Sequence, residues 1–188
     1  DYDVIESNPV RCPDMDAAEK MKEAIMAAKE RGDSVGGITQ LEIKGLPAGL
    51  GDPVFGKIEA VLARAMISIG AVKGIEFGRG FEIARLNGSQ NNDPMQDGDF
   101  LSNNAGGTLG GISTGQDLVC RMVVKPTASV SVEQKTIDIY GKNTNLVVEG
   151  RHDPCIIPRV IPVMESMAAL VILDLWEIQE RLRPGWNQ

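Results

Sequence analysis

The stretch PRVIPVMESMAALVILDLWEIQ, residues 158–179, is the longest periodic segment of the chain and decides its fold. Its apolar side chains recur at helical spacing and form one broad stripe: Val160, Val163, Met164, Met167, Leu170, Val171 and Ile178. A stripe this wide predicts a helix buried on most of its surface, either in the chain's own core or against a second subunit.

Other elements precede this helix in an irregular order. Helices are expected over residues 14–33, with Asp14 or Asp16 as the cap, and over Phe55–Ile69. Strands are expected over residues 36–46, Lys73–Phe77, Phe81–Leu86, Leu118–Val124, Thr136–Tyr140 and near Asn145–Val148. Regular alternation of strand and helix is absent, so the order favours an α+β fold with antiparallel sheets over a doubly wound parallel sheet.

Composition excludes several classes of protein. The 188 residues suffice for one domain or two small, closely packed ones. With 19 basic and 26 acidic residues the net charge is −7, which argues against nucleic acid or an anionic membrane as a partner. Three cysteines and no apolar run of membrane-spanning length favour a reducing, cytoplasmic compartment. One histidine, His152, makes a self-contained Ser-His-Asp triad or a two-His metal site hard to build.

The first dozen residues, DYDVIESNPVRC, have no clean period and follow no initiating Met. They are typical of a connector that enters a domain. We therefore expect a piece of a longer protein, with simple N-terminal processing as the alternative.

Residues 103–115, NNAGGTLGGISTG, carry five glycines and are the first candidate for an anion site. Glycines can direct successive backbone amides at one point and so cradle a phosphate. The segment lacks the Gly-Lys-Ser/Thr ending of a P-loop and the GxGxxG dinucleotide pattern. A tight turn or a close backbone approach is the favoured alternative.

Lys125-Pro126-Thr127-Ala128-Ser129, directly after an expected strand, is the second candidate. One ammonium and two hydroxyls at alternate positions suit the oxygens of a phosphate. Pro126 keeps the residue before it extended. The alternative is an ordinary strand end with a solvated lysine.

Gly150-Arg151-His152-Asp153-Pro154-Cys155 is the third candidate. Arg151 offers a bidentate fork for phosphate or carboxylate, whereas Asp153 has the alternative of capping the long helix. His152 and Cys155 have the spacing of half a metal site, but no second pair exists elsewhere. The three candidates supply anion-binding groups and no hydrolytic nucleophile with a base, which indicates a binder of a phosphorylated, anionic small molecule.

Residues 150–170, GRHDPCIIPRVIPVMESMAAL, resemble the C-terminal signature of chorismate synthase. Seven further segments resemble that family in the family's order: NPVRCPD, RGDSVGG, GLPAGLGDPVF, AMISIGAVKGIEFGRGF, LNGSQNND, NNAGGTLGGISTGQ and KPTASV. The resemblance covers nearly the whole chain, residues 1–188, and corresponds to the C-terminal half or so of the family's usual length. The N-terminal portion, with the family's two active-site histidines, is expected to be absent.

The resemblance implies a lyase of the shikimate pathway of aromatic amino acid biosynthesis. Chorismate synthase converts 5-enolpyruvylshikimate 3-phosphate to chorismate and phosphate by a 1,4-anti elimination that needs reduced FMN. The resemblance also implies that this flavin is reduced with NADPH as the electron source, either by an outside reductase or by an intrinsic activity. The implied fold is a β-α-β sandwich with helices packed between antiparallel sheets, assembled as a cytoplasmic homotetramer.

The resemblance also assigns site residues. Flavin contacts carry over onto Gly70, Ala71, Gly110, Lys125, Pro126, Thr127, Ala128, Ser129 and Arg151, where many family members have Asn or Pro in place of Gly70. Arg151 also matches a substrate contact, and Asp153 matches a catalytic acid near the flavin N5. No metal is implied. The alternative for the isolated chain is a non-catalytic module that binds flavin or phosphate, or that oligomerises through its long helix.

Overall fold

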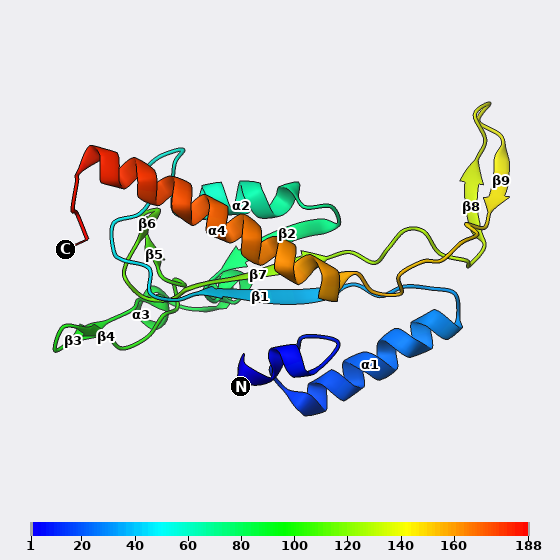
Figure 1. Cartoon of the computed structure of the whole chain (residues 1–188), viewed down its shortest axis with the longest axis horizontal. Helices are drawn as coiled ribbons and strands as arrows, with labels where there is room; N and C mark the ends of the chain where they lie inside the picture. The colour runs from blue at the N-terminus through cyan, green and yellow to red at the C-terminus, as the bar shows by residue number, and fades with distance from the viewer. Residues whose placement is uncertain (1, 188) are drawn as a thin grey trace. The chain divides into compact units, whose positions relative to one another are not determined.

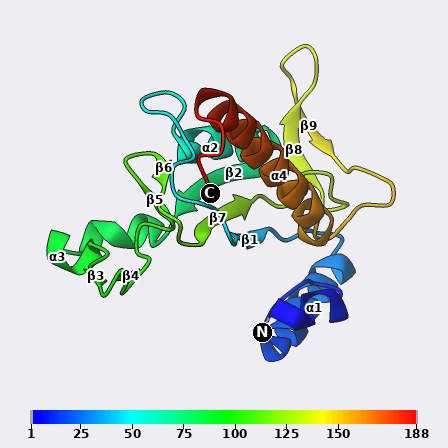
Figure 2. The same cartoon turned by 60° about the vertical axis from the view of Figure 1, so that its left-hand side comes forward.

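The computed structural model describes residues 2–187 (Figures 1 and 2). The chain divides into two compact units. One contains the residues up to Gly37 together with Val124–Ile161, and the other contains Ile38–Val123 with the residues from Pro162 onward. Helices and sheets are both present, and the three strand pairs that stand alone are antiparallel, so the predicted α+β class is confirmed.

A three-stranded sheet organises the second unit, in the order β1 (Gly37–Ile43), β7 (Leu118–Val124) and β2 (Val72–Phe77). Alternate residues of the central strand β7 are buried, namely Leu118, Cys120, Met122 and Val124. Helices α2 (Ile58–Ser68) and α4 (Ile157–Leu182) lie on the same side of this sheet (Figures 1 and 2). Leu62 and Met66 of α2 and Met164 of α4 are buried, and each such side chain contributes roughly 1.5–3 kcal/mol.

The long helix is present as predicted, with bounds slightly wider than the periodic segment. It is not buried on most of its surface in this chain, because Val163, Leu170 and Ile178 of the predicted stripe are exposed. Pro162 lies inside α4 and cannot donate a backbone hydrogen bond. The hydroxyl of Ser166 donates to the Pro162 carbonyl oxygen at 2.7 Å, one turn further on. Among the described residues 2–187, no helix is both long and apolar enough to cross a bilayer.

Short elements link β2 to β7. They are the 3-10 helix η2 (Gly80–Arg85), helix α3 (Gly88–Asn91), and the hairpins β3 (Met95–Gln96) with β4 (Asp99–Phe100) and β5 (Thr108–Leu109) with β6 (Ile112–Ser113). The predicted strand at Phe81–Leu86 is therefore wrong. Gly78 and Gly80 adopt positive φ angles, and the Glu76 carboxylate accepts the Phe81 amide at 3.0 Å, which turns the chain out of the strand.

Asp93 holds the loop that leads into the Gly-rich segment. Its carboxylate accepts hydrogen bonds from the Ser102 hydroxyl and the Asn104 amide, both at 2.6 Å, and from the Ala105 amide at 2.9 Å. Partial burial opposes the charge, but these three donors outweigh it and hold the pKa of Asp93 below its ordinary value. The ionised carboxylate is therefore part of the loop's structure.

The first unit begins with the 3-10 helix η1 (Tyr2–Ser7) and helix α1 (Met15–Glu30). Asp14 caps α1 as predicted, because its side chain accepts the Ala17 amide at 2.9 Å. A small core of Val10, Cys12 and Ala18 lies beside the buried Asn8, whose side chain bonds both the amide and the carbonyl of Cys12. The segment expected to be an irregular connector thus has a 3-10 helix and a local core.

A hairpin of β8 (Gln134–Ile137) and β9 (Asn143–Leu146) completes the first unit. All eight strand residues are exposed, and the predicted strand Thr136–Tyr140 ends three residues early at a turn. In that turn the Asp138 carboxylate accepts the amides of Tyr140 and Lys142. Within residues 2–187 this ribbon is a two-stranded sheet of its own.

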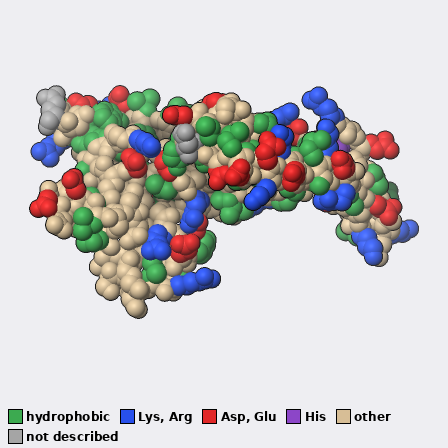
Figure 3. Space-filling view, turned by 90° about the horizontal axis from the view of Figure 1, so that it is seen from below, with side chains coloured by type: hydrophobic (Ala, Val, Ile, Leu, Met, Phe, Trp, Pro, Cys, Tyr) green, Lys and Arg blue, Asp and Glu red, His purple; other side chains and the backbone are tan. Residues whose placement is uncertain are grey.

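The face in Figure 3 shows Lys and Arg side chains interspersed with Asp and Glu. Neither sign of charge forms one large field on this face. Recognition of an anion therefore depends on local groups rather than on a general positive potential.

Candidate functional site

The second sequence candidate, Lys125–Ser129, follows β7 directly and belongs to the first unit. Pro126 has no backbone amide to donate, and the strand ends at Val124, just before Lys125. Lys125 and Ser129 are exposed, and Thr127 is half-buried. Among the residues that the structure describes, the Thr127 Oγ1 atom is inaccessible to solvent and has no hydrogen-bond partner.

The third candidate, Gly150–Cys155, belongs to the same unit and precedes α4. Arg151 is exposed, and no hydrogen bond or ion pair engages its guanidinium within residues 2–187. Asp153 is half-buried, and its Oδ2 atom accepts a hydrogen bond from Nη1 of Arg159 at 2.7 Å. This ion pair holds the carboxylate beside the first turn of α4, and no backbone amide of that turn donates to it.

These two candidates bond to the same short stretch of chain. The Ser34 hydroxyl donates to the Thr127 carbonyl oxygen at 2.7 Å, and the Val35 amide donates to the Pro154 carbonyl oxygen at 2.8 Å. Residues 34–35 therefore bond to Thr127 of the second candidate and to Pro154 of the third. Sequence reasoning missed this link, although RGDSVGG supplies the residues for it.

The glycines of the second unit do not form one cluster. Gly70 and Ala71 follow the C-terminal end of α2, where Ala71 has a φ of 73°. Gly110 lies next to Gly111, whose carbonyl oxygen accepts the amide of Ile58, the first residue of α2, at 2.9 Å. The 11 residues of α2 span about 16 Å, so the two sets lie at opposite ends of the helix. Their role in flavin binding stays a prediction.

The Gly-rich segment forms a tight turn, as the favoured alternative stated. Leu109 pairs with Ile112, and the two loop residues Gly110 and Gly111 have φ angles of 63° and 90°. Two positive φ values in a two-residue hairpin loop are typical of a type I′ turn. A Cβ atom on Gly107 would lie 2.5 Å from the Asp117 carbonyl oxygen, so close backbone packing explains that glycine.

His152 has a structural contact rather than a metal environment. Its Nε2 atom lies 3.1 Å from the Val148 carbonyl oxygen. Within the described part of the chain, no group of three or more His, Cys, Asp or Glu side chains could hold a metal ion.

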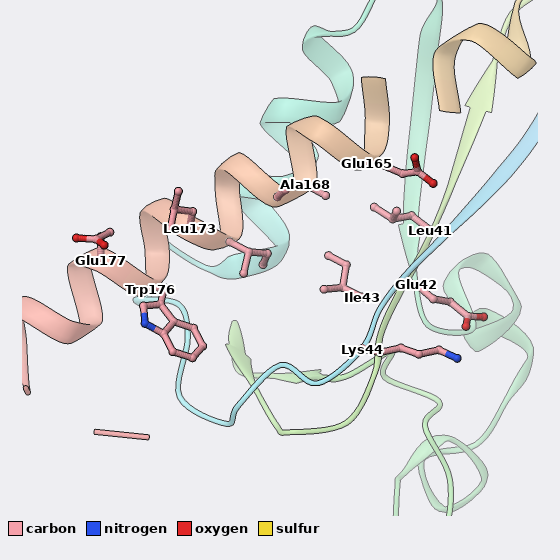
Figure 4. A pocket seen from close by; sticks show the side chains of 11 residues that line it. Leu41, Glu42, Ile43, Lys44, Glu165, Ala168, Leu173, Trp176 and Glu177 are labelled. Atoms are coloured by element: carbon pink, nitrogen blue, oxygen red, sulfur yellow. The ribbon is translucent and has the colours of Figure 1, made fainter. Parts of the chain in front are cut away.

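A cavity of about 620 Å³ in the second unit lies elsewhere. Strand β1 and helix α4 line it, and Leu41, Ile43, Ala168 and Trp176 lie around the space between them (Figure 4). None of the predicted site residues lines it. Because its lining is mainly aliphatic and aromatic, the polar segments of the first unit are the better candidate for an anion.

The first unit thus offers an exposed ammonium at Lys125, an exposed guanidinium at Arg151, an exposed hydroxyl at Ser129 and the ion-paired carboxylate of Asp153. Cationic and hydroxyl groups of this kind can bind phosphate, and a carboxylate can accept a proton.

The family model described as chorismate synthase matches residues 2–176. The chain is similar to "Chorismate synthase" of Methanosarcina barkeri (strain Fusaro / DSM 804), with 56% identity over 175 residues, 90% of this chain and 48% of that protein. It is also similar to "Chorismate synthase" of Desulfatibacillum aliphaticivorans, with 53% identity over 183 residues, 97% of this chain and 51% of that protein.

A solved structure gives the same result. The "Crystal Structure of Chorismate Synthase" superposes with a TM-score of 0.75 at 32% identity, covering 93% of this chain and 47% of that one. The chain spans about half the length of the curated relatives that it matches. Since the family model covers most of the sequence, the chain belongs to the chorismate synthase family.

Proposed function

We propose that this protein takes part in the conversion of 5-enolpyruvylshikimate 3-phosphate to chorismate and inorganic phosphate. In this 1,4-anti elimination the allylic carbon–oxygen bond to phosphate breaks, a ring proton leaves, and a new carbon–carbon double bond forms without net redox change. Family membership over residues 2–176 is the observation that carries the proposal.

The residues of the first unit fit reduced FMN as the cofactor. The exposed Lys125 and Arg151 complement its phosphate and the phosphate of the substrate, and the exposed Ser129 hydroxyl supplies an uncharged donor. When bound, reduced FMN would supply electron density that labilises the allylic phosphate. Gly70, Ala71 and Gly110 are further proposed contacts.

Asp153 is proposed to accept or relay the ring proton. A general base must be held within reach of its proton, and the 2.7 Å bond from Arg159 holds this carboxylate by one oxygen. Its second oxygen, Oδ1, accepts no hydrogen bond within residues 2–187, so it is available for the proton. Arg159 would then act as an orienting group.

Because the chain spans about half of its relatives, the complete activity is proposed to need groups from the rest of the family fold and assembly into a homotetramer. Alone, the chain would act as a module that binds flavin or phosphate. The unengaged Arg151 and Lys125 favour this second role for the isolated chain.

The test is an anaerobic assay of chorismate formation with chemically reduced FMN. The chain is assayed alone and together with the unmatched part of the Methanosarcina barkeri relative, supplied as a separate polypeptide. Activity only in the mixture supports the proposal. A mixture that assembles and binds FMN but forms no chorismate contradicts it.

In this assay the variant Asp153→Asn tests proton acceptance by Asp153, because an amide does not titrate at the pH of the assay. We expect turnover of the assembled enzyme to fall by about a hundredfold or more, with FMN binding retained. Asp174→Asn removes the same charge from an exposed position on α4 and is the matched control. Turnover of Asp153→Asn within a few-fold of the control would assign Asp153 to the scaffold.

A further inference from the structure

Residues Gly32–Gly36, which connect α1 to β1, contact both predicted ligand-binding segments of the first unit. The Ser34 hydroxyl donates to the Thr127 carbonyl oxygen at 2.7 Å. The neighbouring Val35 amide donates to the Pro154 carbonyl oxygen at 2.8 Å. Two consecutive residues thus bond to segments that lie more than 90 positions further along the chain.

The glycines on either side allow a close approach of the backbones. A Cβ atom on Gly36 would collide with the Val124 carbonyl oxygen and would lie 2.9 Å from both N and Cδ of Pro126. Gly32 has a φ of 69°, and its carbonyl oxygen accepts the Ser131 amide at 2.8 Å. Contacts at both ends of Lys125–Ser129 therefore fix that segment to Gly32–Gly36.

Ser34 is itself held in place, since the Asp33 carboxylate accepts the Ser34 amide at 2.8 Å. Its hydroxyl bonds to the main chain of Thr127 and leaves the Thr127 hydroxyl without a partner among residues 2–187. Fixing the backbone of Thr127 orders the segment that carries the exposed side chains of Lys125 and Ser129, so less ordering has to accompany ligand binding.

We propose that Ser34 is a positioning residue for the anion-binding groups of Lys125–Ser129. Through Val35, the same stretch sets the place of Pro154 and hence of the adjacent Asp153. Ser34 touches neither cofactor nor substrate; it acts through the main chain of Thr127. The inference rests on the proposed function, because it takes those segments to be the FMN and substrate site.

The experiment compares Ser34→Ala, Ser34→Thr and Ser7→Ala with the unchanged 188-residue chain. Ser7 is the matched control, because its hydroxyl also donates to a backbone carbonyl, that of Val4 at 2.6 Å, but in the exposed helix η1. Hydrogen exchange is measured for the amides of residues 125–131 and 151–155, and FMN affinity is measured by quenching of flavin fluorescence. The thermal midpoint is recorded for each variant.

For Ser34→Ala we expect faster exchange at residues 125–131 and FMN binding weaker by about 2- to 12-fold, the usual range for one neutral hydrogen bond. Ser34→Thr keeps the hydroxyl and should restore both, while Ser7→Ala should change neither. Gly36→Ala should have the same local effects and a larger exchange increase. Equal exchange at residues 125–131 in Ser34→Ala and the unchanged chain would overturn the proposal.

If Ser34 contributes only to general stability, Ser34→Ala and Ser7→Ala should lower the thermal midpoint alike and leave FMN affinity unchanged. That result would also overturn the proposal. If the unchanged chain binds no FMN, its proposed flavin role fails for the isolated chain. The exchange measurement still decides whether Ser34 orders Lys125–Ser129.

Discussion

The Gly-rich segment of the second unit and the polar segments of the first unit differ in how their donors are used. In the Gly-rich segment, backbone amides are bonded within the fold: those of Asn104 and Ala105 to Asp93, and that of Gly107 to the Asn103 side chain at 2.6 Å. In the first unit, the side chains of Lys125 and Arg151 are exposed, and the Thr127 hydroxyl is unpartnered within the described residues.

This difference shows that glycine content and ligand binding are separate signals. Glycine is required where backbones crowd or φ is positive, which is the case at Gly78, Gly106 and Gly107. A ligand site instead needs donors that the fold leaves unengaged. Four measurements test whether crowded glycines and unengaged side chains have these separate roles.

The largest expected effect is on stability, from Gly107→Ala. Its φ of 81° and the 2.5 Å approach of a Cβ to the Asp117 carbonyl oxygen predict a loss of about 2–6 kcal/mol, from backbone strain and overpacking together. Gly110→Ala, with a φ of 63° and no atom within 4 Å, should lose only about 1–2 kcal/mol. Urea unfolding measures both, and equal losses would refute backbone crowding as the reason for Gly107.

Arg151→Ala tests the other side of the comparison. An unengaged guanidinium that binds phosphate should contribute about 1.5–3 kcal/mol to affinity, so FMN binding should weaken by about 10- to 150-fold. Arg183→Ala, at an exposed position after α4, is the control. Unchanged FMN affinity in Arg151→Ala would make Arg151 a solvated surface residue.

Asp93 gives a pH test of the fold that supports the Gly-rich segment. Its pKa is lower in the folded chain than the ordinary value, so its stabilisation is complete above the unfolded pKa near 4 and is lost as pH falls through the folded pKa. Asp93→Asn should lower stability by about 1 kcal/mol at pH 7, and the gap to the unchanged chain should narrow below pH 4. Thermal unfolding from pH 7 to pH 3 measures the gap, and a constant difference would contradict an ionic role.

The smallest effect concerns thiol labelling in the native chain. Burial raises the pKa of Cys120 to about 12, so almost no thiolate forms at pH 8. Cys155, which is half-buried, should react with a thiol reagent before the buried Cys12 and Cys120. Early labelling of Cys120 would indicate that the sheet opens, and peptide mapping after partial labelling distinguishes the sites.

The sequence predicts elements whose burial is periodic. The alternating buried residues of β7 and the apolar stripe of α4 are visible in the residue pattern, and both elements were predicted close to their observed bounds. The segment Phe81–Leu86 has apolar residues too, but Phe81 is 85% exposed, and side-chain bonding by Glu76 decides the local conformation. That bond cannot be read from residue spacing.

In the candidate site, too, some features can be predicted from the residue pattern and others depend on contacts made in the fold. Lys125, Thr127, Arg151 and Asp153 were predicted from residue type and from resemblance, and their assignment to ligands stays a prediction. The contact of Ser34 with Thr127 spans 93 positions, and a single sequence gives no sign of such a pairing. Chemistry-bearing residues can thus be found from the sequence, whereas the residues that position them need the fold.

The β8–β9 ribbon has a practical consequence for handling the protein in solution. Ile139 and Tyr140 at its turn are 90% and 81% exposed, and each strand has an open backbone edge. Such an edge is a template for intermolecular strand pairing, and two-stranded ribbons are marginal in water. Lys135 and Lys142 place charge on the ribbon and disfavour stacking. Concentrated samples should therefore precipitate faster as salt screens these charges, so low ionic strength suits storage.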